Sequence, residues 1–373
     1  MPVRPVDDKP SDTLVVVSGE GFWTGSSTLP HLHQCVRSPA HPELESTAPS
    51  RRLAPTIAIL PVMPDPIVLV GSPTALGGHF DGMERTPAEL RRLGLVDRLR
   101  AAPGLAAATL VDAGDAPNDQ GWAPDDDRHA KNRARIVTYL PRLATHVRDG
   151  LLAAGEGGAA PRLLVVGGDC TSHAGAMAGI VRARPGIRLG ICWFDAHGDF
   201  NTPQTTPSGN VWGMPFAMLL GHGDEDLVAA CDGPTADAGD AALLGGQVLD
   251  EQESRMIAGS RVAHFGAGML GTDSGLAALG AWARTVAGRV DAFYVAFDLD
   301  ALDAAGDWAV AMPEPNGLSL ETAIAAVRTI AATGPVIGFG ATAILVGRGG
   351  NADRTLDAAV RLADAALGAD SGP

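Results

Sequence analysis

Short apolar runs recur along this chain from residue 66 onward, and longer stretches with helical periodicity lie between them. The runs are rich in Val, Ile, Leu and Phe without polar alternation, which is typical of strands buried on both faces. They are Ile67–Val70, Leu163–Val166, Leu189–Phe194, Val262–Phe265, Phe293–Phe297 and Val336–Phe339. Strands that alternate with helices predict an α/β fold, in which a mainly parallel sheet is covered by helices and ligands bind at the strands' carboxyl ends.

The intervening helices are predicted from amphipathic spacing and from their start signals. Thr86-Pro87-Ala88-Glu89 suggests an N-cap, a proline at the first helical position and a glutamate at the third, leading into Leu90–Leu99. Other helices are expected over 130–152, 172–182, 274–286, 321–332 and 353–367. The stretch Gly221–Gly246 is rich in Gly, Asp and Ala without periodicity, so we expect a long surface insertion there.

Composition divides the chain and limits its partners. Residues 1–64 mix Pro, Ser, His and Arg and are predicted to be a partly irregular extension, followed by one domain over 65–368 and a tail over 369–373. A formal net charge of −15 disfavours nucleic acid and anionic membranes. The four scattered cysteines do not suggest a disulfide framework, and neither a membrane span nor a secretory signal is visible. We therefore expect a cytoplasmic protein with a small-molecule ligand, and we assign no role to His31 and His33.

Two acidic motifs follow buried runs. Asp195, His197 and Asp199 stand two apart after one predicted strand, and Asp298 and Asp300 follow another a hundred residues on. The ends of parallel strands aim side chains at one point, and four carboxylates with one imidazole suit manganese or a similar divalent ion. A polar loop that caps the next helix is the alternative for the first motif, and an ordinary acidic pair is the alternative for the second. The motifs together favour two metal ions, because clustered carboxylates repel one another without a counter-ion.

In order and spacing, four segments resemble the ureohydrolase (arginase/agmatinase) family, and the arginase branch most closely. They are Val166–Thr171, Phe194–Asn210, Phe297–Asp303 and Met312–Ser319, and Gly77–Pro87 also matches the family's first loop and helix. The resemblance extends over roughly residues 66–367. It implies a three-layer α/β/α fold with a roughly eight-stranded, mainly parallel sheet, and a homo-oligomer that is a trimer or a hexamer.

The resemblance also implies a binuclear manganese centre with six ligands. Five ligand positions carry over directly, namely Asp195, His197, Asp199, Asp298 and Asp300. The sixth, a histidine in the family, is Cys170 in this chain. A thiolate is softer than imidazole and shifts the preference towards zinc, cobalt, nickel or iron. Cys170 is therefore a ligand of an altered metal, a thiol beside a weakened site or simply a small buried residue, and His173 is another candidate imidazole.

The family match extends to catalysis and substrate binding. Two metal ions would activate water, and Asp199 is the residue we expect to carry a proton to the leaving amine. Asn201, Ser208 and Asn210 match positions that bind an α-carboxylate in the arginase branch, which favours an amino-acid-like substrate. The alternative is that these three residues only form turns.

Three further departures separate this chain from arginase. A tryptophan, Trp212, stands where the branch has a proton-transferring histidine. The guanidinium-binding glutamate would fall near Thr342–Ile344, where the chain has no acid, and the segment that binds the α-amino group would fall near Gly268–Gly271, where only Asp273 is close. An unpaired buried guanidinium is costly, so the substrate is a less basic amidine or ureide, or Glu314 or Asp273 supplies the charge.

These observations predict a metal-dependent hydrolase of a linear C–N bond in a guanidino or ureido compound, releasing urea or a related product. One alternative is a catalytically impaired relative with a scaffolding or ligand-sensing role, which the altered positions suggest. Another is a formimino or amide hydrolase that uses the same two-metal site.

Overall fold

The computed structural model describes residues 65–368, and the positions 1–64 and 369–373, including His31 and His33, lie outside the described residues. The division of the chain into extension, domain and tail stays a prediction. In the described part, no helix combines the length and the apolar character needed to cross a membrane.

Eight strands form one sheet in the order β2-β1-β3-β8-β7-β4-β5-β6, and every neighbouring pair is parallel. The strands are β1 Ile67–Gly71, β2 Leu110–Asp115, β3 Arg162–Val166, β4 Leu189–Asp195, β5 Ala241–Gly245, β6 Ala263–Phe265, β7 Ala292–Asp298 and β8 Val336–Thr342. The predicted parallel α/β fold is therefore confirmed.

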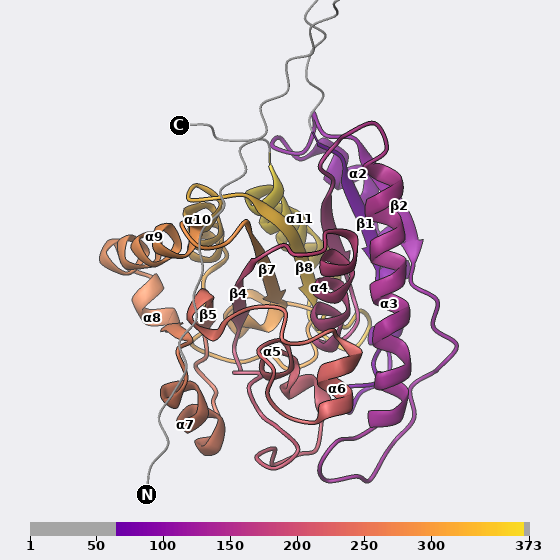
Figure 1. The fold of residues 1–373 in the computed structure, drawn as a ribbon, viewed down its shortest axis with the longest axis vertical. Helices are drawn as coiled ribbons and strands as arrows, with labels where there is room; N and C mark the ends of the chain where they lie inside the picture. Colours follow the sequence, from indigo (N-terminus) through magenta and orange to yellow (C-terminus); the bar gives the residue numbers. More distant parts are fainter. Residues whose placement is uncertain (1–64, 369–373) are drawn as a thin grey trace, which may run out of the picture. The chain divides into compact units, whose positions relative to one another are not determined.

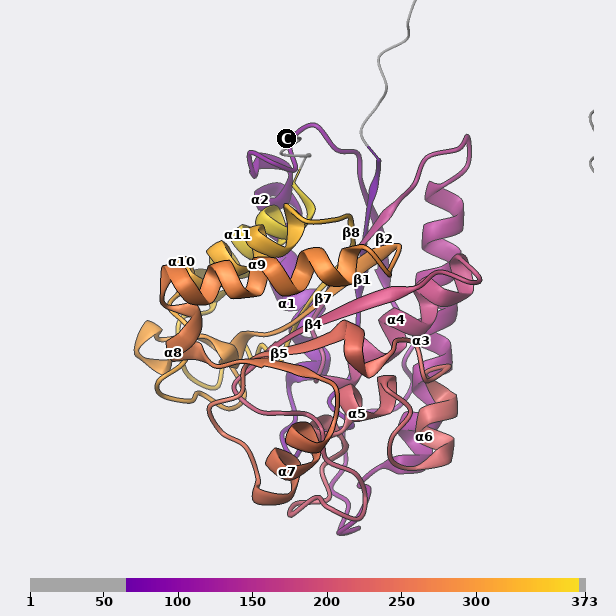
Figure 2. The same ribbon diagram turned by 60° about the vertical axis from the view of Figure 1, so that its left-hand side comes forward.

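Helices cover both faces of this sheet (Figures 1 and 2). On one face lie α3 Arg133–Ala154, α4 Thr171–Ala183, α5 Pro215–Leu219 and α6 Glu225–Ala230. On the other lie α1 Thr86–Arg92, α2 Leu95–Ala101, α9 Asp273–Ala287, α10 Leu320–Ala331 and α11 Ala352–Leu367. The short helices α7 Glu251–Gly259 and α8 Ala267–Leu270 follow β5 and β6.

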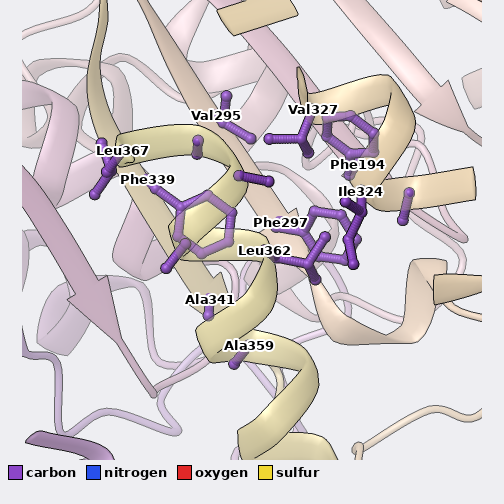
Figure 3. Close-up of a cluster of buried hydrophobic side chains, with 14 of the residues drawn as sticks. Phe194, Val295, Phe297, Ile324, Val327, Phe339, Ala341, Ala359, Leu362 and Leu367 are labelled. Carbon is purple, nitrogen blue, oxygen red and sulfur yellow. The ribbon is translucent and has the colours of Figure 1, made fainter. Parts of the chain in front are cut away.

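Alternate strand residues supply the two hydrophobic cores. In β1, Ile67 and Leu69 join the core beneath α10 and α11, whereas Val68 and Val70 join the core beneath α3 and α4. Figure 3 shows part of the first core, in which Phe297 and Phe339 of the sheet pack with side chains from the helices above them. Burial on both faces explains why the strands lack polar alternation.

The structure corrects three local expectations. Gly221–Gly246 is not a surface insertion, because it contains α6 and the wholly buried strand β5. The helix expected over Leu90–Leu99 is broken near Gly94, whose φ of 92° ends one helix and starts the next. Thr86 is the first residue of α1 rather than its cap, and its hydroxyl donates to the carbonyl oxygen of Ile344 at 2.6 Å.

The four central strands are β3, β8, β7 and β4, which are adjacent in the sheet. Their carboxyl ends lead into Cys170, Ala343, Asp298 and Asp195–Asp199 respectively. The metal motifs, Cys170 and Ala343 thus lie together at the carboxyl ends of these four strands.

Candidate metal centre and substrate cavity

Asp195 is the last residue of β4 and is held in a fixed orientation. One carboxylate oxygen accepts a hydrogen bond from the indole nitrogen of Trp193 at 3.0 Å, and the other accepts from the backbone nitrogen of His197 at 2.7 Å. The imidazole Nδ1 of His197 lies 3.3 Å from Asp195 Oδ1 and 3.4 Å from Asp300 Oδ2. Three of the predicted ligands therefore converge on one point.

The turn after His197 depends on close backbone packing. A Cβ atom on Gly198 would lie 2.4 Å from Glu253 Cδ, so a larger residue would push Glu253 away. The next residue, Asp199, has a left-handed φ of 47°, and its carbonyl oxygen accepts from the backbone nitrogens of Phe216 and Ala217 in α5. Such a conformation is unfavourable for a non-glycine residue and persists only where the surroundings impose it.

The end of β7 is joined to the end of β4 by hydrogen bonds. Asp298 accepts from the backbone nitrogen of Asp300 at 2.8 Å, and Asp300 accepts from the backbone nitrogen of Ala196 at 3.2 Å. Cys170, at the start of α4, donates its thiol hydrogen to Asp298 Oδ2 across 2.9 Å. All six predicted ligand positions thus lie in one cluster.

Two groups of residues in this cluster have the geometry to hold a metal ion. We call Cys170, Asp195 and Asp199 the thiolate triad, and Asp195, His197 and Asp300 the imidazole triad. Within each triad, one ligand atom per residue lies within 4.8 Å of the others. Asp195 belongs to both triads, so the two triads together would hold two ions in one centre.

Electrostatics also fit divalent ions. Burial raises the pKa of Asp199 and of Asp298 well above the ordinary value, and the charge of neighbouring carboxylates raises both further. Burial and the charge of Asp195 raise the pKa of Asp300 to about 6. Asp199 Oδ2 is buried without any hydrogen-bond partner. Buried carboxylates that lack a cation are unfavourable, and a metal pair would relieve this repulsion.

His173 does not replace the missing imidazole. It belongs to neither triad, and its two ring nitrogens lie 3.1 Å from Tyr294 Oη and 2.9 Å from Thr342 Oγ1. Complete burial lowers its pKa to about 3, so the ring is neutral. His173 instead links β7 and β8 beneath the site.

A cavity of about 240 Å³ opens above the cluster. Its lining includes five of the six predicted ligands and all three predicted substrate residues, namely Cys170, His197, Asp199, Asp298, Asp300, Asn201, Ser208 and Asn210. The structure therefore brings the predicted site residues together around one space.

The three predicted substrate residues already have partners. The Asn201 amide donates to Asp250 Oδ2 at 3.0 Å and to Glu253 Oε1 at 3.3 Å. Asn210 Oδ1 accepts from Lys131 Nζ at 3.0 Å, and Ser208 Oγ accepts from the Asn210 backbone at 3.2 Å. Asn201 therefore orients two acids at the cavity wall.

Those acids, Asp250 and Glu253, form what we call the acidic wall, and sequence reasoning missed them. Asp250 is exposed, whereas burial raises the pKa of Glu253 to about 7. The segment Gly268–Gly271, near which we expected the group that binds the α-amino group, lies in α8 and its C-cap, and neither it nor Asp273 lines the cavity. The sequence feature that could have revealed them is the pair Asp250-x-x-Glu253 shortly after β5. Its position at a strand end is not apparent unless Ala241–Gly245 is recognised as a strand.

Ala311, Met312 and Ala343 form what we call the apolar wall of the same cavity. Trp212 also lines the cavity, and its ring packs against His79 with the ring centres 5.1 Å apart. Glu314, an alternative source of negative charge, has its Oε1 3.7 Å from His197 Nε2 but is not among the lining residues.

Comparison with known proteins agrees with this architecture. Residues 65–368 match the model of the arginase family. Arginase from Bacillus caldovelox is 30% identical over 277 residues, which is 71% of this chain and 86% of that protein. The native crystal structure of B. caldovelox arginase aligns with a TM-score of 0.71 at 26% identity, covering 83% of this chain and 100% of that one.

A more distant structure has the same fold. Formimidoylglutamase from Bacillus subtilis aligns with a TM-score of 0.63 at 19% identity, covering 81% of this chain and 86% of that one. Together with the eight-stranded sheet, these matches place the chain in the arginase family, whose members are hydrolases of carbon–nitrogen bonds in linear amidines.

Proposed function

We propose that this chain is a metal-dependent hydrolase of a guanidino or ureido compound that resembles an amino acid, releasing urea or a related small product. The observation that carries the proposal is the position of the two triads beneath a cavity that also contains the acidic wall. The metal ligands would be Cys170, Asp195, His197, Asp199, Asp298 and Asp300. A homo-oligomer and a cytoplasmic location stay predictions.

Two divalent ions, when bound, would supply an activated water and polarise the carbon under attack. Asp199 would carry the proton from the attacking water to the leaving amine, because this residue lines the cavity and its buried Oδ2 has no hydrogen-bond partner among the described residues. The acidic wall would pair with the substrate's amino group. Asn201, Ser208 and Asn210 would complete this polar end, with Lys131 behind Asn210 supplying positive charge for a carboxylate.

The reacting group is proposed to be less basic than a guanidinium. Ala311, Met312 and Ala343 offer no charge to a cation, and an unpaired buried cation costs several kcal/mol. Trp212 has no titratable group with which to transfer protons. Neutral ureido compounds and weakly basic amidines therefore fit the cavity better than arginine does.

A substrate screen tests this proposal. Protein loaded separately with manganese, cobalt, nickel or zinc would be incubated with matched guanidino, ureido and formimino compounds, and release of urea, ammonia and amine would be measured. We expect hydrolysis of an amino-acid-like ureido or weakly basic amidine compound above arginine.

The same screen separates the alternatives. Hydrolysis confined to formimino compounds would favour the formimino alternative. Metal binding without hydrolysis of any compound would favour the impaired relative, for which the altered residues Cys170, Trp212 and Ala343 are the supporting observation. Failure to bind any of the four metals would contradict both the guanidino or ureido hydrolase and the formimino hydrolase.

A further inference from the structure

We infer that the two metal positions are chemically unequal. The thiolate triad takes a thiophilic divalent ion of the zinc, cobalt or iron class, whereas the imidazole triad takes an ion of the manganese class. This inference rests on the two-metal centre of the proposed function and adds which ion each position selects.

The first support is the position of the Cys170 thiol in the cluster. Cys170 Sγ lies within 4.8 Å of carboxylate oxygens of both Asp195 and Asp199, and Cys170 is 5% exposed and lines the cavity. Its thiol donates a hydrogen bond to Asp298, whose carboxylate belongs to the same cluster. No movement of the backbone is therefore needed to bring sulfur and oxygen donors to one ion.

The second support is independent of the cysteine. Asp199 is 4% exposed, and its Oδ2 has no hydrogen-bond partner within residues 65–368. Buried polar atoms are almost always paired, so an unpaired carboxylate oxygen beside a thiol and a second carboxylate points to a cation-binding position. The backbone of Asp199, with its left-handed φ of 47°, is anchored by the hydrogen bonds that its carbonyl oxygen accepts from Phe216 and Ala217.

The contrast between the triads gives the selectivity. Thiolate sulfur favours softer ions such as zinc, whereas the two carboxylates of the imidazole triad are the ligand type that suits manganese. Binding at the thiolate triad replaces the S–H bond of Cys170 by an S–metal bond and releases the proton to solvent. The thiolate triad then carries three negative charges, two carboxylates and one thiolate, whereas the imidazole triad carries two. The two positions therefore differ in both softness and charge.

The chain also provides matched controls. Cys192 is buried in β4 within the hydrophobic core, and Cys231 donates to the carbonyl oxygen of Val228 at 3.3 Å. Neither lies in a triad, so Cys192→Ser and Cys231→Ser remove thiols without removing a proposed ligand. Cys35→Ser controls for the thiol outside the described residues.

The experiment is an anaerobic titration of metal-free, full-length protein with cobalt. Absorbance reports sulfur–cobalt charge transfer in the near ultraviolet, and elemental analysis gives the cobalt bound. We expect a charge-transfer band that saturates when half of the final cobalt is bound. Cys170→Ser and Cys170→His should lose this band and still bind cobalt at the imidazole triad, while the three control variants keep it.

A second measurement guards against misfolding of the variants. Zinc and manganese affinities of wild type and Cys170→Ser would be compared by calorimetry, with circular dichroism to verify the fold. We expect zinc affinity to fall about 10-fold or more and manganese affinity to change far less.

The outcomes separate the two proposals. Binding of two cobalt ions without a charge-transfer band, or a band that survives in Cys170→Ser, would overturn this inference and leave the two-metal centre standing. Failure of the wild-type protein to bind cobalt, zinc or manganese would overturn the proposed function and this inference with it.

Discussion

Strands β4 and β7 end differently from β8, although the three lie in the order β8-β7-β4 in one parallel sheet. The first two end in acids, Asp195 and Asp298, whose loops supply five of the six proposed metal ligands. β8 ends at the same edge in Thr342, and the next residue, Ala343, belongs to the apolar wall.

The carboxyl ends of these strands therefore have two separable roles, binding metal and contacting the reacting group of the substrate. The proposed metal centre depends on the acids that follow β4 and β7. The polarity of the cavity wall beside the substrate's reacting group depends on the residues that follow β8. Because each loop is anchored by its own strand, the residues after β8 can change without moving the carboxylates after β4 and β7. The following predictions test this separation.

The largest effect is expected where β7 supplies a proposed ligand. Asp298→Asn should lower kcat/KM on the best substrate of the screen by more than about 100-fold, because a ligand is lost. The metal-free variant should unfold at a higher temperature than metal-free wild type, because one of several repelling buried carboxylates is gone. Kinetics, metal content and thermal unfolding measure both effects.

Asp307→Asn, an exposed acid in the loop after β7, is the matched control. It should change neither kinetics nor metal content. Full activity in Asp298→Asn would show that the end of β7 does not supply an essential metal ligand, and β7 would then not differ from β8 in this respect.

A smaller effect is expected at the acidic wall. Asp250→Asn should raise KM about tenfold or more for substrates with a free amino group, because a charge-assisted hydrogen bond is lost. kcat should change little, and substrates without the amino group should bind as before. The neighbouring Glu251→Gln alters an exposed acid paired with Arg255 and serves as the control. An equal rise in KM for both substrate types would remove Asp250 from amino-group recognition.

Glu314→Gln tests whether this acid serves the metal centre or the substrate. Its carboxylate lies near His197 Nε2, so we expect metal affinity to fall about 10-fold through a less basic imidazole. Calorimetry with the metal-free protein measures the change, and Glu321→Gln on α10 is the control. A selective loss of cationic substrates with unchanged metal affinity would instead make Glu314 the substrate's counter-charge.

The smallest effect is expected in the pH dependence of stability. In the metal-free protein the pKa of Asp300 is raised to about 6 and that of Glu253 to about 7. A raised pKa in the folded state favours the protonated form, so stability is full at low pH and is lost as pH rises through 6 to 7. We expect Tm of metal-free protein to fall by about 5 °C between about pH 5 and about pH 8.

Two comparisons check this assignment. Metal should reduce the fall in Tm, because a cation neutralises the carboxylates around Asp300, and Glu253→Gln should reduce it in the metal-free protein. A metal-free Tm that stays level or rises over this range would show that these acids do not dominate the pH dependence.

Most of the fold was predictable, because buried parallel strands form continuous apolar runs. β5 was missed because Ala241–Gly245 is an Ala- and Gly-containing strand inside a stretch of similar composition. That omission also concealed Asp250 and Glu253, whose place at the cavity follows from β5 being in the sheet.

The predicted metal ligands were found together because they follow strands at regular two-residue spacing. Other features had no local signal. The contacts of His173 with Tyr294 and Thr342 join residues more than a hundred positions apart, and the left-handed φ of Asp199 is set by its surroundings. Such features arise only when the sheet order brings distant residues together.

The packing of His173 makes the order of substitutions at this site matter. A Cβ atom on Gly340 would lie 2.6 Å from the imidazole Cε1 and Nδ1 of His173, so the ring and any side chain at position 340 exclude each other. The same Cβ atom would lie 2.7 Å from Tyr294 Oη, so a side chain at position 340 requires both His173 and Tyr294 to be shortened first. The order of substitution therefore matters: redesign of this part of β8 must begin with the buried rings that face Gly340 and not with Gly340 itself.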